Sequence, residues 1–425
     1  MVERHSPQTH HITNKHICPK AKKILNGLDK ANHEAYLVGG AVRDLLLDKI
    51  PKDFDIATSA HPEEVKRTFG SGCRLIGRRF RLAHVHFGRE YLEVATFRAP
   101  HDDHESGRTS DDGRIIHDNV YGTLEEDALR RDFTVNALFY DLNTGDVLDH
   151  VKGMDDIHAR QLRLIGDPET RYREDPVRML RAIRFAAKLD FTIHPDTEQP
   201  IYSLGHLLKN IAPARLFDET LKLFHGGKAL ETFRKLRQYD LFQYLFPLTE
   251  HSLAMEDNDE FLNFIEIALK NTDKRINSGK STTPSFLFAV MLWDKLTAHF
   301  EYHMEEGQPA YQAMHKAASD VFSEQVRAIS VPKRFSTMTR EIWALQDRFN
   351  RKDCRSSLSF IEHKRFRAAY DFFCLRSKAG YLPAEECEWW TTFQFLPREE
   401  QEEACKEFAG PKKKRRRRRK KPQSD

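Results

Sequence analysis

One segment near the start of the chain does most to limit its fold: a short apolar strand, a glycine pair, a helix, and a strand that carries two aspartates. It covers residues 36–58, YLVGGAVRDLLLDKIPKDFDIAT. The apolar run Tyr36 to Val38 predicts a strand, and the spacing of Ala41 to Leu47 predicts a helix. Between them, Gly39 and Gly40 lack side chains, so backbone N–H groups can approach a phosphate where the helix starts. A glycine pair alone is more often a plain turn. The aspartates that follow favour a phosphate-binding turn here.

The two aspartates stand two residues apart in Asp53-Phe54-Asp55-Ile56. The strand period of two predicts both carboxylates on one face, with Phe54 and Ile56 buried on the other. Two anionic oxygen ligands this close suit Mg²⁺, and a pair of such ions can activate an attacking hydroxyl and neutralise a triphosphate leaving group. An isolated aspartate pair is usually a solvated strand edge. After a glycine turn and a helix, we predict a site for two Mg²⁺ ions.

Two further acids compete for the third position at this site. Glu93 lies in the second strand of a predicted hairpin spanning residues 80–97. Asp132 follows two arginines in the block RRDFTVNAL, residues 130–138. The residues alone leave open which acid completes the metal site.

Two other polar features lie near these motifs. His84 and His86 share a strand face, but without other soft ligands we expect satisfied or exposed histidines rather than metal ligands. Residues 101–119 are rich in Asp, Ser, Gly and His and predict a loop between a strand and the next motif. The loop is a candidate for substrate contact, and a plain solvated loop is equally favoured.

The signals for secondary structure change along the chain and predict an α+β fold followed by helices. Strand-like and helical stretches alternate up to about residue 150, whereas the helical period dominates beyond residue 165. The predicted organisation is a polar N-terminal segment at 1–30, a catalytic head at 31–150, a helical neck at 151–225, a helical body at 226–410 and a disordered basic tail at 411–425.

The charge of the chain is concentrated in that tail. The formal net charge is +4, and Lys412 to Lys421 is an unbroken run of ten basic residues, so the remaining residues carry a formal charge of −6. An acidic body with a cationic tail predicts a polyanionic partner such as RNA, bound in part by counterion release.

Cysteine spacing and hydropathy exclude several classes of protein. The longest apolar run, Phe286 to Trp293, is eight residues and too short to span a bilayer. No signal peptide is recognised, so a cytoplasmic location is expected. The cysteines are scattered without C-x-x-C pairs, which argues against a zinc site or a disulfide framework and predicts reduced, mostly buried thiols. They are Cys18, Cys73, Cys354, Cys374, Cys387 and Cys405.

A predicted amphipathic helix at Arg173 to Leu189 carries a polar arc that can read a nucleobase. Asp175, Arg178 and Arg181 lie together on this arc, opposite the apolar face. Asp accepts from an exocyclic amine, and Arg donates to ring or carbonyl acceptors. A surface ion-pair face is the simpler interpretation of the same pattern.

Together these motifs resemble the class II branch of the nucleotidyltransferase superfamily, which contains bacterial poly(A) polymerases and CCA-adding tRNA nucleotidyltransferases. The matching blocks are LVGGAVRDLLL with DFDIAT, RRDFTVNAL, and EDPVRMLRAIRF, and they cover residues 36 to about 220. The resemblance implies a DNA polymerase β-like head, a helical neck and body, and transfer of AMP from ATP, with two Mg²⁺ ions, to RNA 3′ ends.

The same resemblance implies roles for individual residues. Asp53 and Asp55 would be the catalytic metal ligands, Asp132 would belong to the active site, and Glu93 occupies a position where the family carries another acid. The E-D-x-x-R element, here Glu174, Asp175 and Arg178, would select the nucleotide in place of a template. The implied nucleotide-binding residues are Gly39, Gly40, Arg43, Arg131, Asp175, Arg178 and Arg181.

Two features favour the poly(A) polymerase branch. The block Leu75 to Val85, LIGRRFRLAHV, resembles one that marks this branch, although its arginines could form a solvated strand edge. The basic tail suits sequence-independent binding of RNA better than recognition of tRNA shape. The alternatives are a CCA-adding enzyme, a catalytically inactive RNA-binding protein, and a nuclear protein whose tail is a localisation signal.

Overall fold

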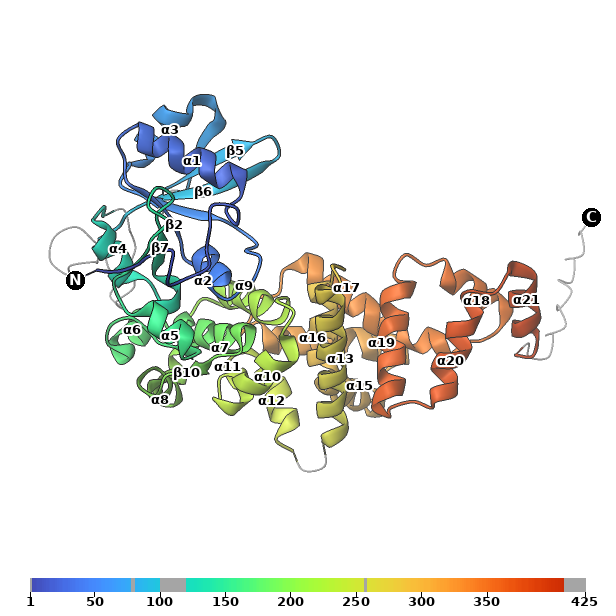
Figure 1. The fold of residues 1–425 in the computed structure, drawn as a ribbon. Helices are drawn as coiled ribbons and strands as arrows, with labels where there is room; N and C mark the ends of the chain where they lie inside the picture. The colour runs from blue at the N-terminus through green and yellow to red at the C-terminus, as the bar shows by residue number, and fades with distance from the viewer. Residues whose placement is uncertain (1, 78–80, 100–119, 256–257, 409–425) are drawn as a thin grey trace, which may run out of the picture. The chain divides into compact units, whose positions relative to one another are not determined.

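An eight-stranded sheet forms the centre of the first of two units in the described parts of the chain (Figure 1). This computed structural model describes residues 2–77, 81–99, 120–255 and 258–408. Unit 1 comprises residues 1–211 and 234–241, and unit 2 comprises residues 212–233 and 242–425. Neighbouring strands of the sheet are antiparallel, apart from the parallel pair β3 and β6. In spatial order the strands are β1 (Glu3–His5), β8 (Val147–Asp149), β7 (Leu138–Tyr140), β2 (Ala35–Val38), β3 (Asp55–Thr58), β6 (Glu90–Thr96), β5 (Leu82–Phe87) and β4 (Cys73–Ile76).

One face of the β3–β6–β5–β4 half of the sheet is covered by helices. Helix α3 (Pro62–Phe69) packs on β4, β5 and β6, and α1 (Pro19–Lys30) contacts β2, β3 and α3 (Figure 1). Alternate residues of β5 and β6, including Ala83, Val85 and Val94, are almost fully buried. The intervening residues Tyr91 and Glu93 are exposed, so the opposite face is the polar one.

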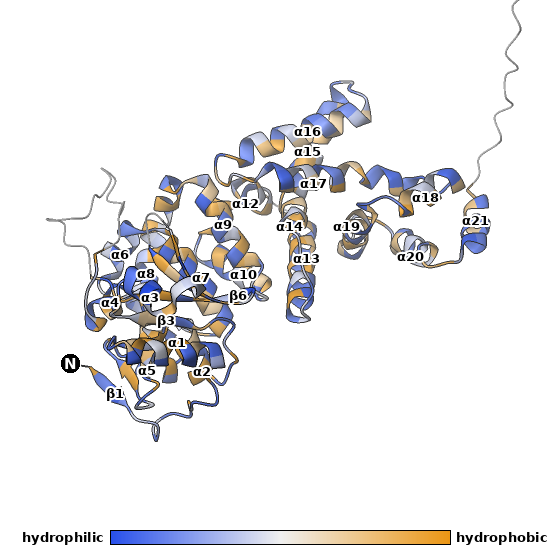
Figure 2. Cartoon of the chain, turned by 90° about the horizontal axis from the view of Figure 1, so that it is seen from above, coloured by the Kyte–Doolittle hydropathy of each residue, from blue (hydrophilic) through white to orange (hydrophobic). Residues whose placement is uncertain are grey.

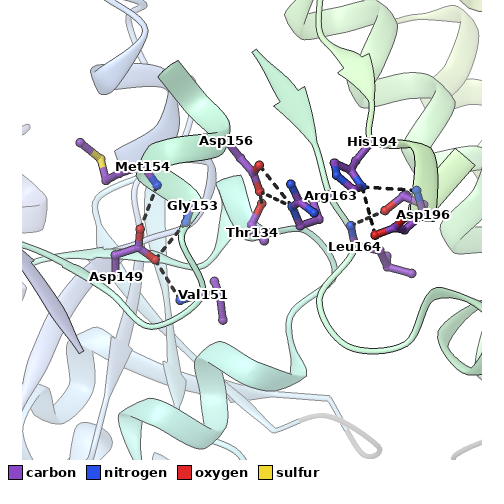
Figure 3. A network of polar contacts seen from close by, with 11 residues as sticks. Thr134, Asp149, Val151, Gly153, Met154, Asp156, Arg163, Leu164, His194 and Asp196 are labelled. Carbon is purple, nitrogen blue, oxygen red and sulfur yellow. Dashed lines mark hydrogen bonds and ion pairs between the residues drawn. The ribbon is translucent and has the colours of Figure 1, made fainter. Parts of the chain in front are cut away.

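The rest of unit 1 consists of short helices and two short strands, and a polar network joins some of them (Figure 3). Asp149 accepts hydrogen bonds from the backbone N–H groups of Val151, Gly153 and Met154 at 2.9–3.0 Å. A side chain at Gly153 would lie 2.4 Å from the carbonyl oxygen of Thr134, so only glycine allows this approach. The elements are α2 (Gly40–Leu46), η1 (Gly70–Gly72), α4 (Leu124–Arg130), η2 (Thr134–Asn136), α5 (Gly153–His158), β9 (Gln161–Leu162), α6 (Pro168–Glu174), α7 (Val177–Leu189), β10 (Thr192–Ile193), α8 (Pro195–Leu204) and η3 (Gly205–Asn210).

The same network fixes η2 from its other side. Thr134 Oγ1 donates to Asp156 Oδ2 at 2.7 Å, and Arg163 Nε donates to the same carboxylate at 3.2 Å (Figure 3). These contacts anchor η2, which begins two residues after Asp132. They therefore restrict the backbone next to this predicted site residue.

The predicted single helix from Arg173 to Leu189 is wrong, because the chain forms two helices with a break at Asp175 and Pro176. Asp175 is extended, with φ −148° and ψ 92°, and α7 begins after Pro176. Proline disfavours helical backbone in the residue before it and lacks the N–H that would continue the helix. The helical spacing on both sides concealed this break.

Unit 2 is helical throughout the part that the structure describes, and apolar and polar residues alternate along its helices (Figure 2). Its most apolar helix, α14, is buried over Leu287 to Met291 and packs against α13, α15, α17 and α19. The helices are α9 (Pro213–Phe224), α10 (Ala229–Gln238, which continues into unit 1), α11 (Phe242–Leu245), α12 (Pro247–Leu253), α13 (Asp259–Asn277), α14 (Pro284–Met291), α15 (Trp293–Glu305), α16 (Ala310–Gln325), α17 (Lys333–Ala344), η4 (Gln346–Asn350), α18 (Cys354–Ile361), α19 (Phe366–Ala379), α20 (Ala384–Phe393) and α21 (Arg398–Lys406).

The prediction of six reduced thiols is corrected in unit 2. Cys354 is joined to Cys405 and Cys374 to Cys387, whereas Cys18 and Cys73 are free. The partners lie 51 and 13 residues apart in sequence and meet because α18 packs on α21 and α19 on α20. Spacing along the chain carries no sign of such contacts.

The predicted α+β head followed by a largely helical remainder is confirmed. No described helix is both long and apolar enough to cross a lipid bilayer. The predicted substrate loop at 101–119, the basic tail at 411–425 and the arginines at 78 and 79 lie outside the described residues.

Candidate active site

The two predicted metal ligands lie at the start of β3. Strand β3 begins at Asp55, so Asp53 precedes the strand instead of lying within it. Both aspartates are exposed, whereas Ile56 is 1% exposed and Phe54 is half-buried. Asp55 pairs with Val38 of β2 on one side, and the parallel register of Ile56 with Val94 puts Glu93 of β6 next to it on the other.

Asp55 is surrounded by negative charge. Loss of solvent around its carboxyl group, followed by the charges of Glu93 and Asp53, raises the pKa of Asp55 from 3.8 to about 6, and Arg131 opposes this shift. The charges of Glu93 and Asp53 therefore both disfavour the ionised form of Asp55. A bound cation would relieve their repulsion, so the donors present suit a metal ion.

The glycine turn and Arg131 lie against this acidic group. Gly39 has a φ of +69°, a conformation that favours glycine, and a side chain there would lie 3.5 Å from Arg131 Nη1. Asp127 fixes Arg131 by accepting from its Nε at 3.1 Å and its Nη2 at 2.8 Å. The guanidinium also lies 5.2 Å from the ring centroid of Phe139. A fixed cation therefore lies beside the turn and close enough to Asp55 to affect its pKa.

Asp132 is occupied by other protein groups. Its Oδ2 accepts from Nε of Arg181 at 2.8 Å and also from Nη2 of that residue. Its Oδ1 accepts from the backbone N–H of Phe133 at 2.9 Å and from Asn136 Nδ2 at 3.2 Å. Both oxygens thus have partners, and Asp132 joins the end of the head to α7.

Arg43, expected to bind nucleotide, lies in the interior. It is 2% exposed and donates from Nε to Asp44 Oδ1 at 2.9 Å and from Nη1 to Asn136 Oδ1. Its guanidinium lies 5.3 Å from the ring centroid of Phe185 in α7. Arg43 therefore orients Asn136, which in turn contacts Asp132.

The E-D-x-x-R element is built around a half-buried arginine, Arg178. Arg178 Nη1 donates to Glu174 Oε2 at 2.8 Å and to the carbonyl oxygen of Arg171 at 2.7 Å. Arg171 Nη1 donates to the same Glu174 oxygen at 2.9 Å, and its Nη2 donates to the carbonyl oxygens of Arg130 and Arg131 at 2.7 and 2.9 Å. Glu174 thereby holds Arg178 in place.

Sequence reasoning missed three residues that position this site: Asp127, Asn136 and Arg171. Asp127 precedes Arg131 by four residues at the end of a helix, a spacing that could have indicated the pair. Asn136 follows Asp132 by four residues, but its contact with Arg43 crosses 93 residues. The main-chain contacts of Arg171 have no signal in sequence.

Three models of protein families match the chain in order along its length. The model described as "Poly A polymerase head domain" matches residues 35–163, and the model of the "Probable RNA and SrmB- binding site of polymerase A" matches residues 190–253. The model described as "Polymerase A arginine-rich C-terminus" matches residues 306–423. The acids Asp53, Asp55, Glu93 and Asp132 all fall in the head match.

Individual relatives agree with these matches. Poly(A) polymerase I of Salmonella typhimurium is 47% identical over 401 residues, covering 93% of this chain and 86% of its own. A CCA-adding enzyme of Lactobacillus helveticus is 42% identical over 215 residues, covering 51% of this chain and 52% of its own. The solved CCA-adding enzyme of Bacillus stearothermophilus in complex with CTP has 26% identity and a TM-score of 0.57, covering 92% of this chain and 82% of its own. Because the similarity to poly(A) polymerase I extends over nearly the whole sequence, this chain belongs to the poly(A) polymerase family of nucleotidyltransferases.

Proposed function

We propose that this protein is a template-independent polynucleotide adenylyltransferase, which transfers AMP from ATP to the 3′ ends of RNA. The observation that carries the proposal is the group of interacting carboxylates, Asp53, Asp55 and Glu93, beside the fixed cation Arg131 and the turn at Gly39. Phosphoryl transfer needs little covalent help from a protein and depends on positioning and on stabilisation of charge. This arrangement can supply both.

The carboxylates are suited to hold two Mg²⁺ ions, with Asp53 and Asp55 as ligands and Glu93 as the third acid. Bound Mg²⁺ would promote ionisation of the attacking hydroxyl and neutralise charge on the triphosphate. In the residues that the structure describes, no three His, Cys, Asp or Glu side chains are arranged to hold a metal ion alone. Mg²⁺ usually binds one or two carboxylates and completes its shell with water and substrate phosphates, as expected here. Asp132 is the poorer ligand, because its oxygens already accept hydrogen bonds.

The reaction follows from this placement. The 3′ oxygen of the RNA attacks the α-phosphorus of ATP, the bond to the bridging oxygen of the β-phosphate breaks, and pyrophosphate leaves with the bonding electron pair. In this proposal the 3′ hydroxyl loses its proton beside the carboxylates, and Arg131, next to the Gly39 turn, balances charge on the phosphates. Asp132 and Arg43 act as positioning residues, since both are committed to contacts inside the protein.

Nucleotide choice is assigned to Asp175 and Arg178. The main-chain break at Asp175 turns the backbone between α6 and α7, and the anchored Nη1 of Arg178 fixes the direction of its guanidinium. A held carboxylate and guanidinium can pair with the edge of one base and leave others without partners. The family assignment favours selection of adenine as the role of this pair.

The lengths of the two alignments favour poly(A) synthesis over CCA addition. Similarity to poly(A) polymerase I covers 93% of the chain, whereas similarity to the CCA-adding relative covers 51%. The model of an arginine-rich C-terminus also matches through residue 423. A basic tail binds phosphates without reading bases, so it gives no signal for stopping after three nucleotides.

The test is incubation of purified protein with a short unstructured RNA, Mg²⁺ and each NTP in turn. ATP alone should give a ladder of many added adenylates, CTP should be used poorly, and Asp55→Asn should give no product. Addition of two C residues and one A to a tRNA lacking its 3′ end, followed by arrest, would overturn the proposal.

A further inference from the structure

The polar face of the sheet continues outward from the acidic group as a row of side chains across four strands. Glu93 of β6 is paired with His84 of β5, and His84 is paired with Arg74 of β4. Since Asp55 is the neighbour of Glu93 on the other side, the row runs Asp55, Glu93, His84, Arg74. Its charge therefore changes from acidic at the metal-binding end to basic at Arg74, which is exposed and has no ion-pair partner among the described residues.

On this face, two further rings lie beside His84. The ring of Tyr91 stacks on His84, with centroids 4.2 Å apart and planes inclined by 9°, and the ring of His86 lies 5.6 Å from Tyr91. His84 is also 3.6 Å from the carboxylate of Glu93. We call Tyr91, His84 and His86 the ring platform.

Tyr91 is the exposed member of the ring platform, whereas His84 and His86 are half-buried. The residues on either side of His84 in β5, Ala83 and Val85, are 0% and 3% exposed and face the covered side of the sheet. Tyr91 itself is 50% exposed, although it is a large hydrophobic residue. The Tyr91 ring is already held against the imidazole of His84 and is exposed on its outer side. Stacking of a flat ligand on it would therefore cost little conformational entropy.

The spacing suits an RNA strand whose end lies at the carboxylates. Strand geometry puts Tyr91 roughly 8 Å from Asp55, two residues along β6 and one strand across. A terminal nucleotide whose 3′ hydroxyl reaches the aspartates can therefore place its base over Tyr91. Upstream phosphates would then follow the row toward Arg74, away from the carboxylates that repel them.

We propose that the ring platform of Tyr91, His84 and His86 binds the 3′-terminal base of the RNA by stacking, while Arg74 contacts the phosphates behind it. The inference rests on the proposed function, because that function brings an RNA 3′ end to Asp53 and Asp55. Stacking accepts any base, as an enzyme that extends RNA of varied sequence requires.

The first experiment uses a short RNA with 2-aminopurine at its 3′ end, mixed with the full-length protein in the absence of ATP. Stacking quenches the fluorescence of this base, so the wild-type protein and Tyr91→Phe should quench it, whereas Tyr91→Leu should not. Tyr202→Leu is the matched control, since Tyr202 is another exposed tyrosine of unit 1, lies in α8 and is 55% exposed. It should quench as the wild type does. Equal quenching by Tyr91→Leu and the wild type would refute the platform.

The second experiment separates RNA from ATP. Loss of one stacked base should raise the KM for RNA about 5- to 100-fold in Tyr91→Leu, with the KM for ATP unchanged. If the KM for ATP rises instead, the platform holds the incoming nucleotide and the inference is wrong. The fluorescence measurement needs no turnover, so a wild-type protein that quenches but adds no nucleotide would contradict the proposed function alone.

Discussion

Arg181 of α7 donates hydrogen bonds from Nε and Nη2 to one oxygen of Asp132, a residue 49 positions earlier in the chain. Burial alone would raise the pKa of Asp132, but the charge and hydrogen bonds of Arg181, with those of Asn136 and the Phe133 N–H, lower it overall. Because the pKa of Asp132 is lower in the folded state, its carboxylate stabilises the fold at pH values above its pKa in the unfolded state. This stabilisation is lost as the pH falls through its pKa in the folded state.

Asp132→Ala should therefore lower the free energy of unfolding by about 3 kcal/mol at pH 7, because it removes the carboxylate that accepts two hydrogen bonds from Arg181. Urea denaturation measures the change. Arg173→Ala is the control, since its pair with Glu169 is exposed and should contribute less than about 1 kcal/mol. Equal effects of the two substitutions would show that the Asp132 pair has no special role in stability.

Asp53→Ala and Asp55→Ala should each abolish nucleotide addition while the fold is retained. Loss of a metal ligand removes stabilisation of the transition state worth several kcal/mol, at least about a hundredfold in rate. Single-turnover assays with ATP and a short RNA measure the loss, and circular dichroism checks the fold. Near wild-type turnover in either variant would refute the metal assignment.

Asp55 also gives a prediction for stability without metal. The pKa of Asp55 is about 6 in the folded protein, compared with its usual value of 3.8. Between pH 3.8 and about pH 6, the folded state therefore binds more protons than the unfolded state. Stability of the metal-free protein should therefore fall as the pH rises from 4 to 6 and stay low above it. Asp55→Asn should raise the Tm of the metal-free protein at pH 7 and reduce the stabilisation by Mg²⁺, as differential scanning calorimetry can show. A lower Tm for Asp55→Asn would contradict the proposed repulsion among the carboxylates.

Asp175→Ala and Arg178→Ala should weaken the choice of nucleotide more than the chemistry. Each lost contact with a base edge should cost about 1–3 kcal/mol of selectivity. Competition between ATP and the other NTPs, read as the ratio of kcat/KM values, measures this directly. An unchanged preference for ATP in both variants would show that α6 and α7 do not select the nucleotide.

Deletion of residues 411–425 should weaken RNA affinity and flatten its dependence on salt, with little effect on ATP binding. The ten basic residues contribute through phosphate contacts and release of counterions. The measurement is the slope of log affinity against log salt concentration for the full chain and the truncated one. The same slope in both would assign the tail to a partner other than RNA.

The parts of the site that sequence predicts are those encoded by local pattern. The glycine turn, the strand at Asp55 and the hairpin carrying Glu93 each depend on a period of two or on residues adjacent in the chain. The break at Asp175 was also encoded locally, by Pro176, but the helical spacing on both sides outweighed it in the prediction. Local sequence therefore predicts the strands that carry Asp55 and Glu93, whereas Asp53 lies before β3 and the helix boundaries near Asp175 differ from the prediction.

Long-range contacts account for what could not be predicted. The contact of Arg43 with Asn136 spans 93 residues, and the bond of Cys354 to Cys405 spans 51. Whether Arg43 faces a ligand or the interior depends on what packs over it, which is a property of the complete fold. For this reason its buried position emerged only with the structure.

The hydrogen bonds of Arg171 join α6 to the head in a way that tolerates substitution at positions 130 and 131. Arg171 attaches α6 to the head through the carbonyl oxygens of Arg130 and Arg131, atoms that every amino acid possesses. This joint does not depend on which side chains stand at 130 and 131. Replacement of residues 168–174 would therefore keep this contact wherever Arg171 is kept, whereas replacement as far as Leu189 would also have to keep Arg181 facing the Asp132 side chain.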